Sequence, residues 1–272
     1  MTTFSNVMVH LDLEHANDAC LRVALECADT FSAKLIGIAA ATGQSPYYGD
    51  VTSAQDPQQQ LRTDVTKRLA QAEDRFRSMS APRKVEWRSA TTRPAEYVSR
   101  EARAADLVVI GAPRNSLVSD LAGNLDPGDL VMQVGRPIMV VPPQVQTLKL
   151  KLGMVCWKDA REARRAVSDA LPLLHKTQEV VVVEVISDES DRDAAHNRVD
   201  DVIFWLERHG IEAFARVFHC PERQDPMEKL FEYGADFIVA GAYGHTRLHE
   251  WVFGGVTHDL LYRSPLCSFL AH

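Results

Sequence analysis

Short apolar runs alternate along the chain with longer stretches in which apolar positions recur every three to four residues. Such runs predict buried strands, and the longer stretches predict helices with one apolar face. Because every predicted strand is followed by a helix or a loop of crossover length, the pattern favours parallel sheets covered by helices on both faces. The predicted strands are 6–11, 34–41, 85–89, 106–111, 137–141, 151–157, 179–186, 214–217, 236–241 and 265–269, and the helices are 16–30, 58–80, 94–104, 126–134, 160–174, 194–209, 225–233 and 258–263.

The second half of the chain repeats the first. The segment Asp106–Ala112 matches Asp236–Ala242, and Asp129 falls opposite Asp259, both at an offset of 130 residues (236 minus 106 and 259 minus 129). A period this long indicates a duplicated domain rather than a solenoid. We therefore expect two α/β domains, residues 1–143 and 150–272, each with its own five-stranded sheet, separated by a stiff polar linker that begins with two prolines.

The last predicted strand of each half is expected to lie at an edge of its sheet. Unpaired edges invite pairing. The two edges can pair with each other within one chain, and pairing between two chains as a homodimer is the alternative.

Composition narrows the class of protein. The chain has 272 residues, a formal charge of −7 and 46% hydrophobic residues, which argues against a general nucleic-acid binder. No apolar stretch is long enough to span a membrane, so no membrane partner is expected. Five cysteines, an odd number without a CxxC pair, fit a reducing compartment, and we expect a cytoplasmic protein.

A glycine-rich segment follows the predicted strand 236–241. Gly241, Gly244, Gly254 and Gly255 surround a loop that leads into the last helix, and Thr257 adds a hydroxyl to its first turn. Glycine lets backbone approach a ligand closely, and free amides at a helix N-terminus suit phosphate oxygens. The alternative is that these glycines only form tight turns between strand and helix.

The spacing glycine, two residues, glycine, nine residues, glycine resembles the glycine motif of the universal stress protein family. The strand order, the proline before each last strand and the duplication also resemble its tandem-domain branch, over nearly the whole chain. The resemblance implies two tandem five-stranded parallel-sheet α/β sandwich domains of the adenine-nucleotide-hydrolase-like type. It also implies a cytoplasmic stress-response protein whose C-terminal domain binds an adenine nucleotide, either ATP or AMP, with or without Mg²⁺. Such a protein is expected to be at most a slow ATPase.

The resemblance also implies a set of binding residues. Lys158 stands where the family carries the Asp that contacts the nucleoside, with Asp159 one residue later, and Gly255 stands where the family carries Ser or Thr. Trp157 and Tyr243 either flank the adenine ring or pack in the core. The expected nucleotide-binding residues are Gly241, Gly244, Gly254, Gly255, Val256, Thr257, Val185, Trp157 and Asp159.

The first half departs from the motif differently. It keeps the expected carboxylate as Asp12, but Arg114 and Asn124 replace the second and third glycines after Gly111. A side chain at Arg114 would crowd the approach of a ligand to the backbone. We therefore expect a degenerate site that stabilises the pair of domains.

Two other functions stay open. The departures at Lys158 and Gly255 favour a module that uses the same crevice for a different small ligand or a partner protein. A metal-dependent enzyme is the other alternative, with His245 and His249 as an i, i+4 pair of zinc ligands. The chain has no G-x-S-x-G elbow and no Walker motif, which argues against the hydrolase and P-loop classes.

Overall fold

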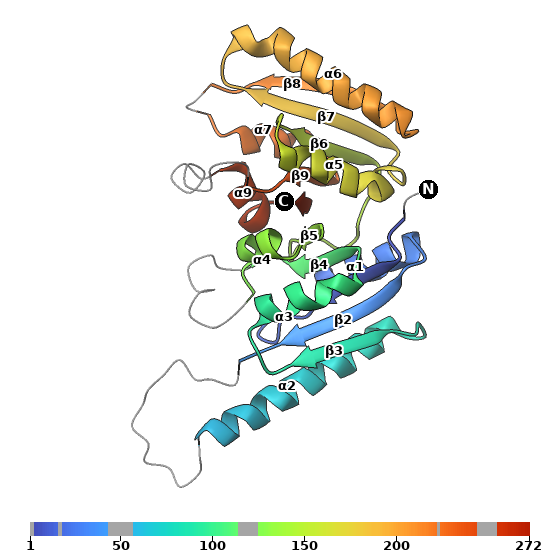
Figure 1. Ribbon diagram of the computed structural model, residues 1–272, viewed down its shortest axis with the longest axis vertical. Helices are drawn as coiled ribbons and strands as arrows, with labels where there is room; N and C mark the ends of the chain where they lie inside the picture. Colours follow the sequence, from blue (N-terminus) through green and yellow to red (C-terminus); the bar gives the residue numbers. More distant parts are fainter. Residues whose placement is uncertain (1–2, 16–17, 43–56, 114–124, 222–223, 244–254) are drawn as a thin grey trace.

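The computed structural model describes residues 3–15, 18–42, 57–113, 125–221, 224–243 and 255–272, and its strands form one ten-stranded sheet (Figure 1). The first half contains β1 Asn6–His10, α1 Asp18–Thr30, β2 Lys34–Ala40, α2 Pro57–Ser80, β3 Glu86–Ala90, α3 Pro94–Glu101, the 3₁₀ turn η1 Ala102–Ala104, β4 Leu107–Gly111, α4 Pro127–Gln133 and β5 Ile138–Val141. The second half contains β6 Leu152–Trp157, α5 Arg161–Leu174, β7 Glu179–Ile186, the 3₁₀ turn η3 Glu189–Asp191, α6 Arg192–Arg208, β8 Ala213–His219, α7 Pro226–Glu232, β9 Phe237–Gly241, α9 Val256–Tyr262 and β10 Cys267–Ala271.

The two halves have the same topology and share an edge. The strand order is β3-β2-β1-β4-β5-β10-β9-β6-β7-β8, and the strands are parallel within each half. At the centre β5 and β10 pair antiparallel, with Met139 opposite Phe269. The α/β fold with two five-stranded halves is confirmed. The expectation of two separate sheets is wrong, because the two last strands satisfy each other's backbone groups.

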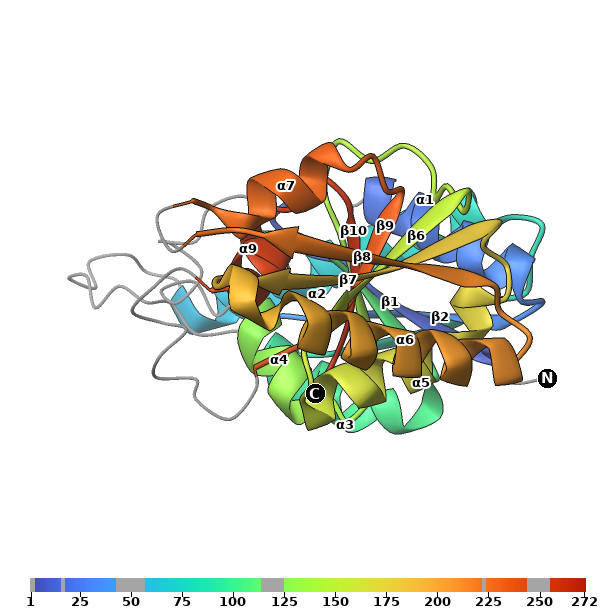
Figure 2. The ribbon, with the colours of Figure 1, turned by 90° about the horizontal axis from the view of Figure 1, so that it is seen from above.

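The helices cover both faces of this sheet. The helices α1, α2, α5 and α6 bury their apolar residues on one face, together with Met139 and Phe269. The helices α3, α4, α7 and α9 pack on the other face. Seen from above, the strands fan out strongly with the sheet twist (Figure 2). None of the helices in the described ranges is both long and apolar enough to cross a membrane.

The repeated aspartates have matching structural roles. One oxygen of Asp106, just before β4, accepts hydrogen bonds from the backbone N–H groups of Ser5 and Asn6, at 2.8 and 2.9 Å. Asp236, just before β9, does the same for Lys151 and Leu152, at 2.9 and 3.0 Å. Each carboxylate thus fixes the start of the first strand of its half beside the fourth.

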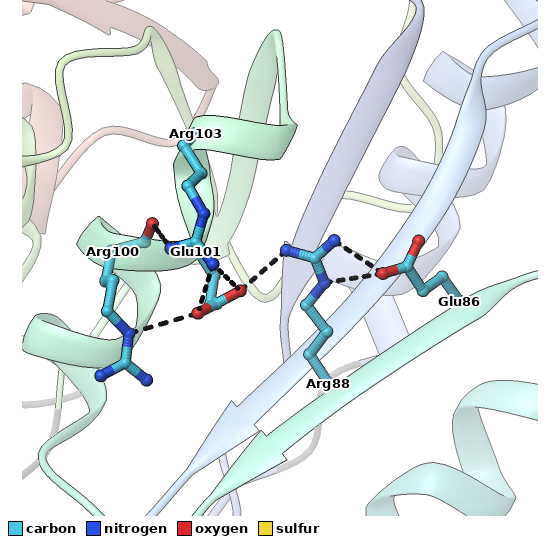
Figure 3. A network of polar contacts seen from close by, with 5 residues as sticks. All are labelled: Glu86, Arg88, Arg100, Glu101 and Arg103. Carbon is cyan, nitrogen blue, oxygen red and sulfur yellow. Dashed lines mark hydrogen bonds and ion pairs between the residues drawn. The ribbon is translucent and has the colours of Figure 1, made fainter.

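A network of charged side chains closes the outer edge of the first half (Figure 3). Glu101 at the end of α3 is 8% exposed and accepts hydrogen bonds from Arg88 on β3, Arg100 and Arg103. Arg88 also contacts the exposed Glu86. Burial alone would raise the pKa of Glu101, but the three guanidinium groups outweigh it and leave the pKa below its ordinary value.

We expect Glu101→Gln to lower the free energy of unfolding by about 1–2 kcal/mol at pH 7. A carboxyl group whose pKa is lower in the folded state contributes stability above its unfolded pKa, and loses it as the pH falls through the folded pKa. The difference between wild type and Glu101→Gln should therefore shrink below about pH 4. Urea titrations at pH 7 and pH 3.5 measure it. Glu86→Gln, at an exposed carboxylate of the same network, is the control and should cost little at either pH. An equal loss at both pH values would contradict the assignment.

Candidate functional site

The strand order of the second half reverses between β6 and β9. From β6 the chain adds β7 and β8 on one side, and β9 then returns to the other side of β6. In open α/β sheets the crevice for a ligand lies beyond the carboxyl ends of the strands at such a point. Cys156 and Ala240 are the last paired residues of β6 and β9, so Trp157 and Gly241 open this crevice side by side.

Gly241 is in close contact with α5. A Cβ atom at this position would lie 2.5 Å from the backbone nitrogen of Ala163 and 2.6 Å from the carbonyl carbon of Glu162. The first turn of α5 therefore crosses directly over the end of β9. Helix packing explains this glycine, whereas the sequence interpretation assigned it to the approach of a ligand.

Thr257 is buried and binds the backbone of Tyr243 rather than facing solvent. Its side chain is 3% exposed, and its Oγ1 accepts a hydrogen bond from the backbone N–H of Tyr243 at 3.3 Å. Tyr243 has a φ of +49°, an uncommon conformation for a tyrosine, so this bond supports a tight turn after β9. Gly255 is the N-cap of α9 and Val256 is 37% exposed in its first turn. Among the described residues of this segment, Gly255 and Val256 are the ones that a ligand can reach.

The sheet separates Trp157 from Val185 and Tyr243. Trp157 packs with the apolar cluster on the α5 and α6 side. Val185 and Tyr243 pack with the cluster on the α7 and α9 side. Asp159 follows Trp157 on the exposed surface, where it pairs with Arg164. A ring that touches both Trp157 and Val185 has to lie across the ends of β6 and β7.

A buried negative charge lies beside Gly241. Glu162 in the first turn of α5 is 3% exposed, its Oε1 pairs with Arg161 at 3.0 Å, and its Oε2 has no hydrogen-bond partner among the described residues. Burial alone would raise the pKa of Glu162. A backbone N–H at the start of the helix and the Arg161 guanidinium lower it by more, so the pKa is below its ordinary value. The carboxylate is ionised at neutral pH and repels an anion from the start of α5.

The first half differs at the corresponding place. Val7 pairs with Leu107, and Gly153 pairs with Phe237, so the register places Asp12 and Lys158 at equivalent positions in the two halves. Asp12 accepts a hydrogen bond from the Glu14 N–H at 2.7 Å and contacts His15 at 2.9 Å. Burial would raise its pKa, and these contacts lower it below normal. The carboxylate of Asp12 is thus engaged within its own loop.

Part of the expected site lies outside the described residues. This holds for Gly244 and Gly254, for the histidines proposed as zinc ligands, and for the two replacements in the first half, which are His245, His249, Arg114 and Asn124. Within the described ranges no group of three or more His, Cys, Asp or Glu side chains has the arrangement of a metal site.

Four of the five cysteines are poor nucleophiles. All five are free thiols. Burial raises the pKa of Cys156 and of Cys267 to about 12, and the pKa values of Cys20 and Cys27 rise still further. A thiolate is therefore scarce at neutral pH at these four positions.

Helix α9, which follows the glycine segment, also contacts the first half. The Tyr262 hydroxyl, on α9, donates a 2.8 Å hydrogen bond to Oδ2 of Asp126, the N-cap of α4, whose Oδ1 accepts from the Asp129 N–H. Burial and the adjacent carboxylate raise the pKa of Tyr262 well above its ordinary value, so the phenol stays protonated. The Tyr243 hydroxyl lies within 2.6 Å of where a Cβ on Gly128 would stand. The candidate site is therefore in direct contact with α4.

Removal of this hydroxyl should loosen the two halves. We expect Tyr262→Phe to lower the free energy of unfolding by about 1–2 kcal/mol, because the partly buried carboxylate of Asp126 loses one of its two hydrogen-bond donors. Tyr233→Phe removes the same atom where no hydrogen bond to a described residue exists, and should change stability by less than about 0.5 kcal/mol. Guanidinium titrations compare them. Equal midpoints for the two variants would show that the contact is not stabilising.

Sequence reasoning missed the cavity between α5 and α6. Trp157 and Asp159 line it, and it has a volume of about 360 Å³. Its other charged and aromatic residues are Arg164, Arg198, Asp201 and Trp205. Their spacing on the predicted helix 194–209 places Arg198 and Trp205 two turns apart on one face, which is the signal that could have indicated them.

Comparison with known proteins gives the fold. No protein-family model matches the sequence, and no curated protein matches it. Among solved structures, a universal stress protein from Archaeoglobus fulgidus DSM 4304 aligns with a TM-score of 0.70 and 14% identity, over 98% of this chain and 95% of that one. A functionally unknown protein from Pseudomonas aeruginosa PAO1 aligns with a TM-score of 0.59 and 11% identity, over 98% of this chain and 92% of that one. The protein therefore has the fold of a universal stress protein over its whole length, as the resemblance implies.

Proposed function

We propose that the second half binds an adenine nucleotide at the carboxyl ends of β6, β7 and β9, with little or no catalysis, as part of a stress response in the cytoplasm. The observation that carries this proposal is the reversal of strand order between β6 and β9, which brings Trp157 and Gly241, the first residue of the glycine segment, side by side. The universal stress protein fold and the glycine spacing support the same ligand.

The charges around the crevice favour one orientation of the nucleotide. The base lies across the ends of β6 and β7, against Trp157 and Val185, and Asp159 faces the ribose. Its ion pair with Arg164 is exposed and therefore weak, so a ribose hydroxyl can compete for the carboxylate. The buried carboxylate of Glu162 turns the phosphates away from α5 and toward the amides of Gly255 and Val256.

The described residues of the crevice offer little for hydrolysis. Asp259 of α9 is 5% exposed and lies 3.3 Å from Arg263, so burial keeps its carboxylate away from an attacking water. A general base has to be within hydrogen-bond reach of the attacking water and free to accept its proton. We therefore expect the bound nucleotide to remain intact, with or without Mg²⁺.

Thermal unfolding with added nucleotide tests this function. A ligand present at a hundred times its Kd stabilises the folded state by about 2.7 kcal/mol. We expect ATP or AMP at millimolar concentration to raise the unfolding temperature. Inorganic triphosphate, which lacks the adenosine, should raise it much less. Phosphate release with Mg²⁺ or Mn²⁺ should stay at the background rate. An unfolding temperature that no adenine nucleotide changes would favour the alternative, a module for a different ligand.

A further inference from the structure

The cavity between α5 and α6 is a second, separate feature of the second half. Its volume of about 360 Å³ falls within the range of small-molecule sites. On α6 the lining residues are spaced by three, four and seven positions, so they form one face of the helix toward α5. The lining residues are Trp157, Asp159, Arg164, Val167, Arg198, Asp201, Val202 and Trp205.

Both arginines of the cavity have a carboxylate partner, an exposed one for Arg164 and a buried one for Arg198. Arg164 pairs with Asp159, and Arg198 binds both carboxylate oxygens of Glu184 on β7, with its Nε at 2.9 and 3.2 Å. Glu184 is 8% exposed, so removal of Arg198 to serve an anionic ligand would leave a buried charge unpaired. Asp201 has no ion pair or hydrogen bond with any residue in the described part of the chain. The charge left for a ligand is therefore negative.

The apolar part of the cavity is rich in indole. Trp157 and Trp205 line it together with Val167 and Val202. Indole is the side chain that binds a cation most strongly through its ring face. The Nε1 of Trp157 is buried and lacks a hydrogen-bond partner among the described residues, which leaves an unsatisfied donor on a residue that lines the cavity. Trp205 is 37% exposed, and the centroid of its ring lies 4.2 Å from that of the His209 ring.

We propose that this cavity binds a small organic cation with an apolar body and one oxygen acceptor, of the hydroxylated quaternary ammonium class. The cationic end meets the carboxylate of Asp201 and the indole of Trp205. The oxygen accepts the hydrogen bond from Trp157. This site shares Trp157 and Asp159 with the proposed positions of the adenine base and ribose, but not Gly255 and Val256, where the phosphates are proposed to bind.

Among the residues of the first half that the structure describes, no equivalent cation site is found. Leu11 follows β1 where Trp157 ends β6, by the register of the two halves. Arg68 and Arg75 of α2 pair with Glu14 and Asp18 across the corresponding gap beside α1. These ion pairs connect α2 with the start of α1 and the residues before it. In the second half, the corresponding helices α5 and α6 have the cavity between them. The cavity thus belongs to the second half.

Choline and its uncharged isostere 3,3-dimethylbutan-1-ol test the charge requirement. We expect choline to bind the full-length protein about tenfold more tightly than the isostere, measured by calorimetry and tryptophan fluorescence. Asp201→Asn should abolish that preference. The matched control is Asp200→Asn, which makes the same change one position along α6, at an exposed residue that does not line the cavity. Benzoate, an aromatic anion, should bind more weakly than choline.

A second pair of variants tests the aromatic wall. Trp205→Ala should weaken choline binding about tenfold, and Phe204→Ala, at a neighbour that is 58% exposed and outside the cavity, should leave it unchanged. ATP binding measured on Asp201→Asn should equal that of wild type, which separates this proposal from the nucleotide site. Equal affinity for choline and its isostere, no binding of choline by wild type, or equal losses in Asp200→Asn and Asp201→Asn would each overturn it.

Discussion

Gly241→Ala is expected to lower the free energy of unfolding by about 3 kcal/mol, whereas Gly111→Ala is expected to be neutral or slightly stabilising. The two glycines are equivalent in the repeat, and both end the fourth strand of their half. A Cβ on Gly241 would meet the backbone of Ala163 at 2.5 Å, and a Cβ on Gly111 would meet no atom within 4 Å. Because backbone cannot rotate away as a side chain can, α5 has to move in the first case.

Urea titrations of the two variants measure this difference. Gly111→Ala is the matched control, since it makes the same substitution at the same strand position without the close contact. It also corrects for the loss of backbone freedom in the unfolded chain, which favours alanine in both variants. Similar unfolding midpoints would show that the start of α5 does not rest on β9 as described.

Val256→Glu is expected to weaken ATP binding about thirtyfold while leaving the fold intact. Val256 is exposed in the first turn of α9, where the proposed phosphates meet the backbone amides. Two like charges about 8 Å apart near a protein surface repel by about 2 kcal/mol. A glutamate in the first turn of a helix stabilises that helix, so the loss would reflect the ligand rather than the fold.

Calorimetric titration with ATP measures the effect, and Val256→Gln is the control for shape. The glutamine has nearly the same size without the charge and should change affinity by less than about threefold. Adenosine, which carries no phosphate, should bind both variants equally. A Val256→Glu protein with unchanged affinity for ATP would move the phosphates away from α9.

Local pattern was sufficient for most elements of the fold. The predicted strand 179–186 coincides with β7, and the predicted helix 58–80 begins one residue after α2. The last helix begins two residues earlier than predicted, because its N-cap is Gly255, which has no capping side chain to indicate a start. The antiparallel junction of β5 and β10 was not determined by pattern, since an apolar strand reads alike whether its neighbour is parallel, antiparallel or absent.

The candidate site was predicted less completely than the fold. The repeat identified Gly241 but not the reason for it, because its nearest atoms come from α5, far away in sequence. Thr257 carries a hydroxyl that suits a phosphate, yet the structure uses it for the backbone of Tyr243. The cavity between α5 and α6 depends on the distance between these two helices over the sheet, which no local sequence pattern predicts.

Calorimetric titration of the full-length protein with ATP and AMP tests the central claim, a nucleotide site in the second half, most directly. The account predicts one binding event per chain at micromolar to millimolar concentration, weakened by Val256→Glu and unaffected by Asp201→Asn. The absence of binding heat for both nucleotides, at concentrations up to several millimolar, would contradict it.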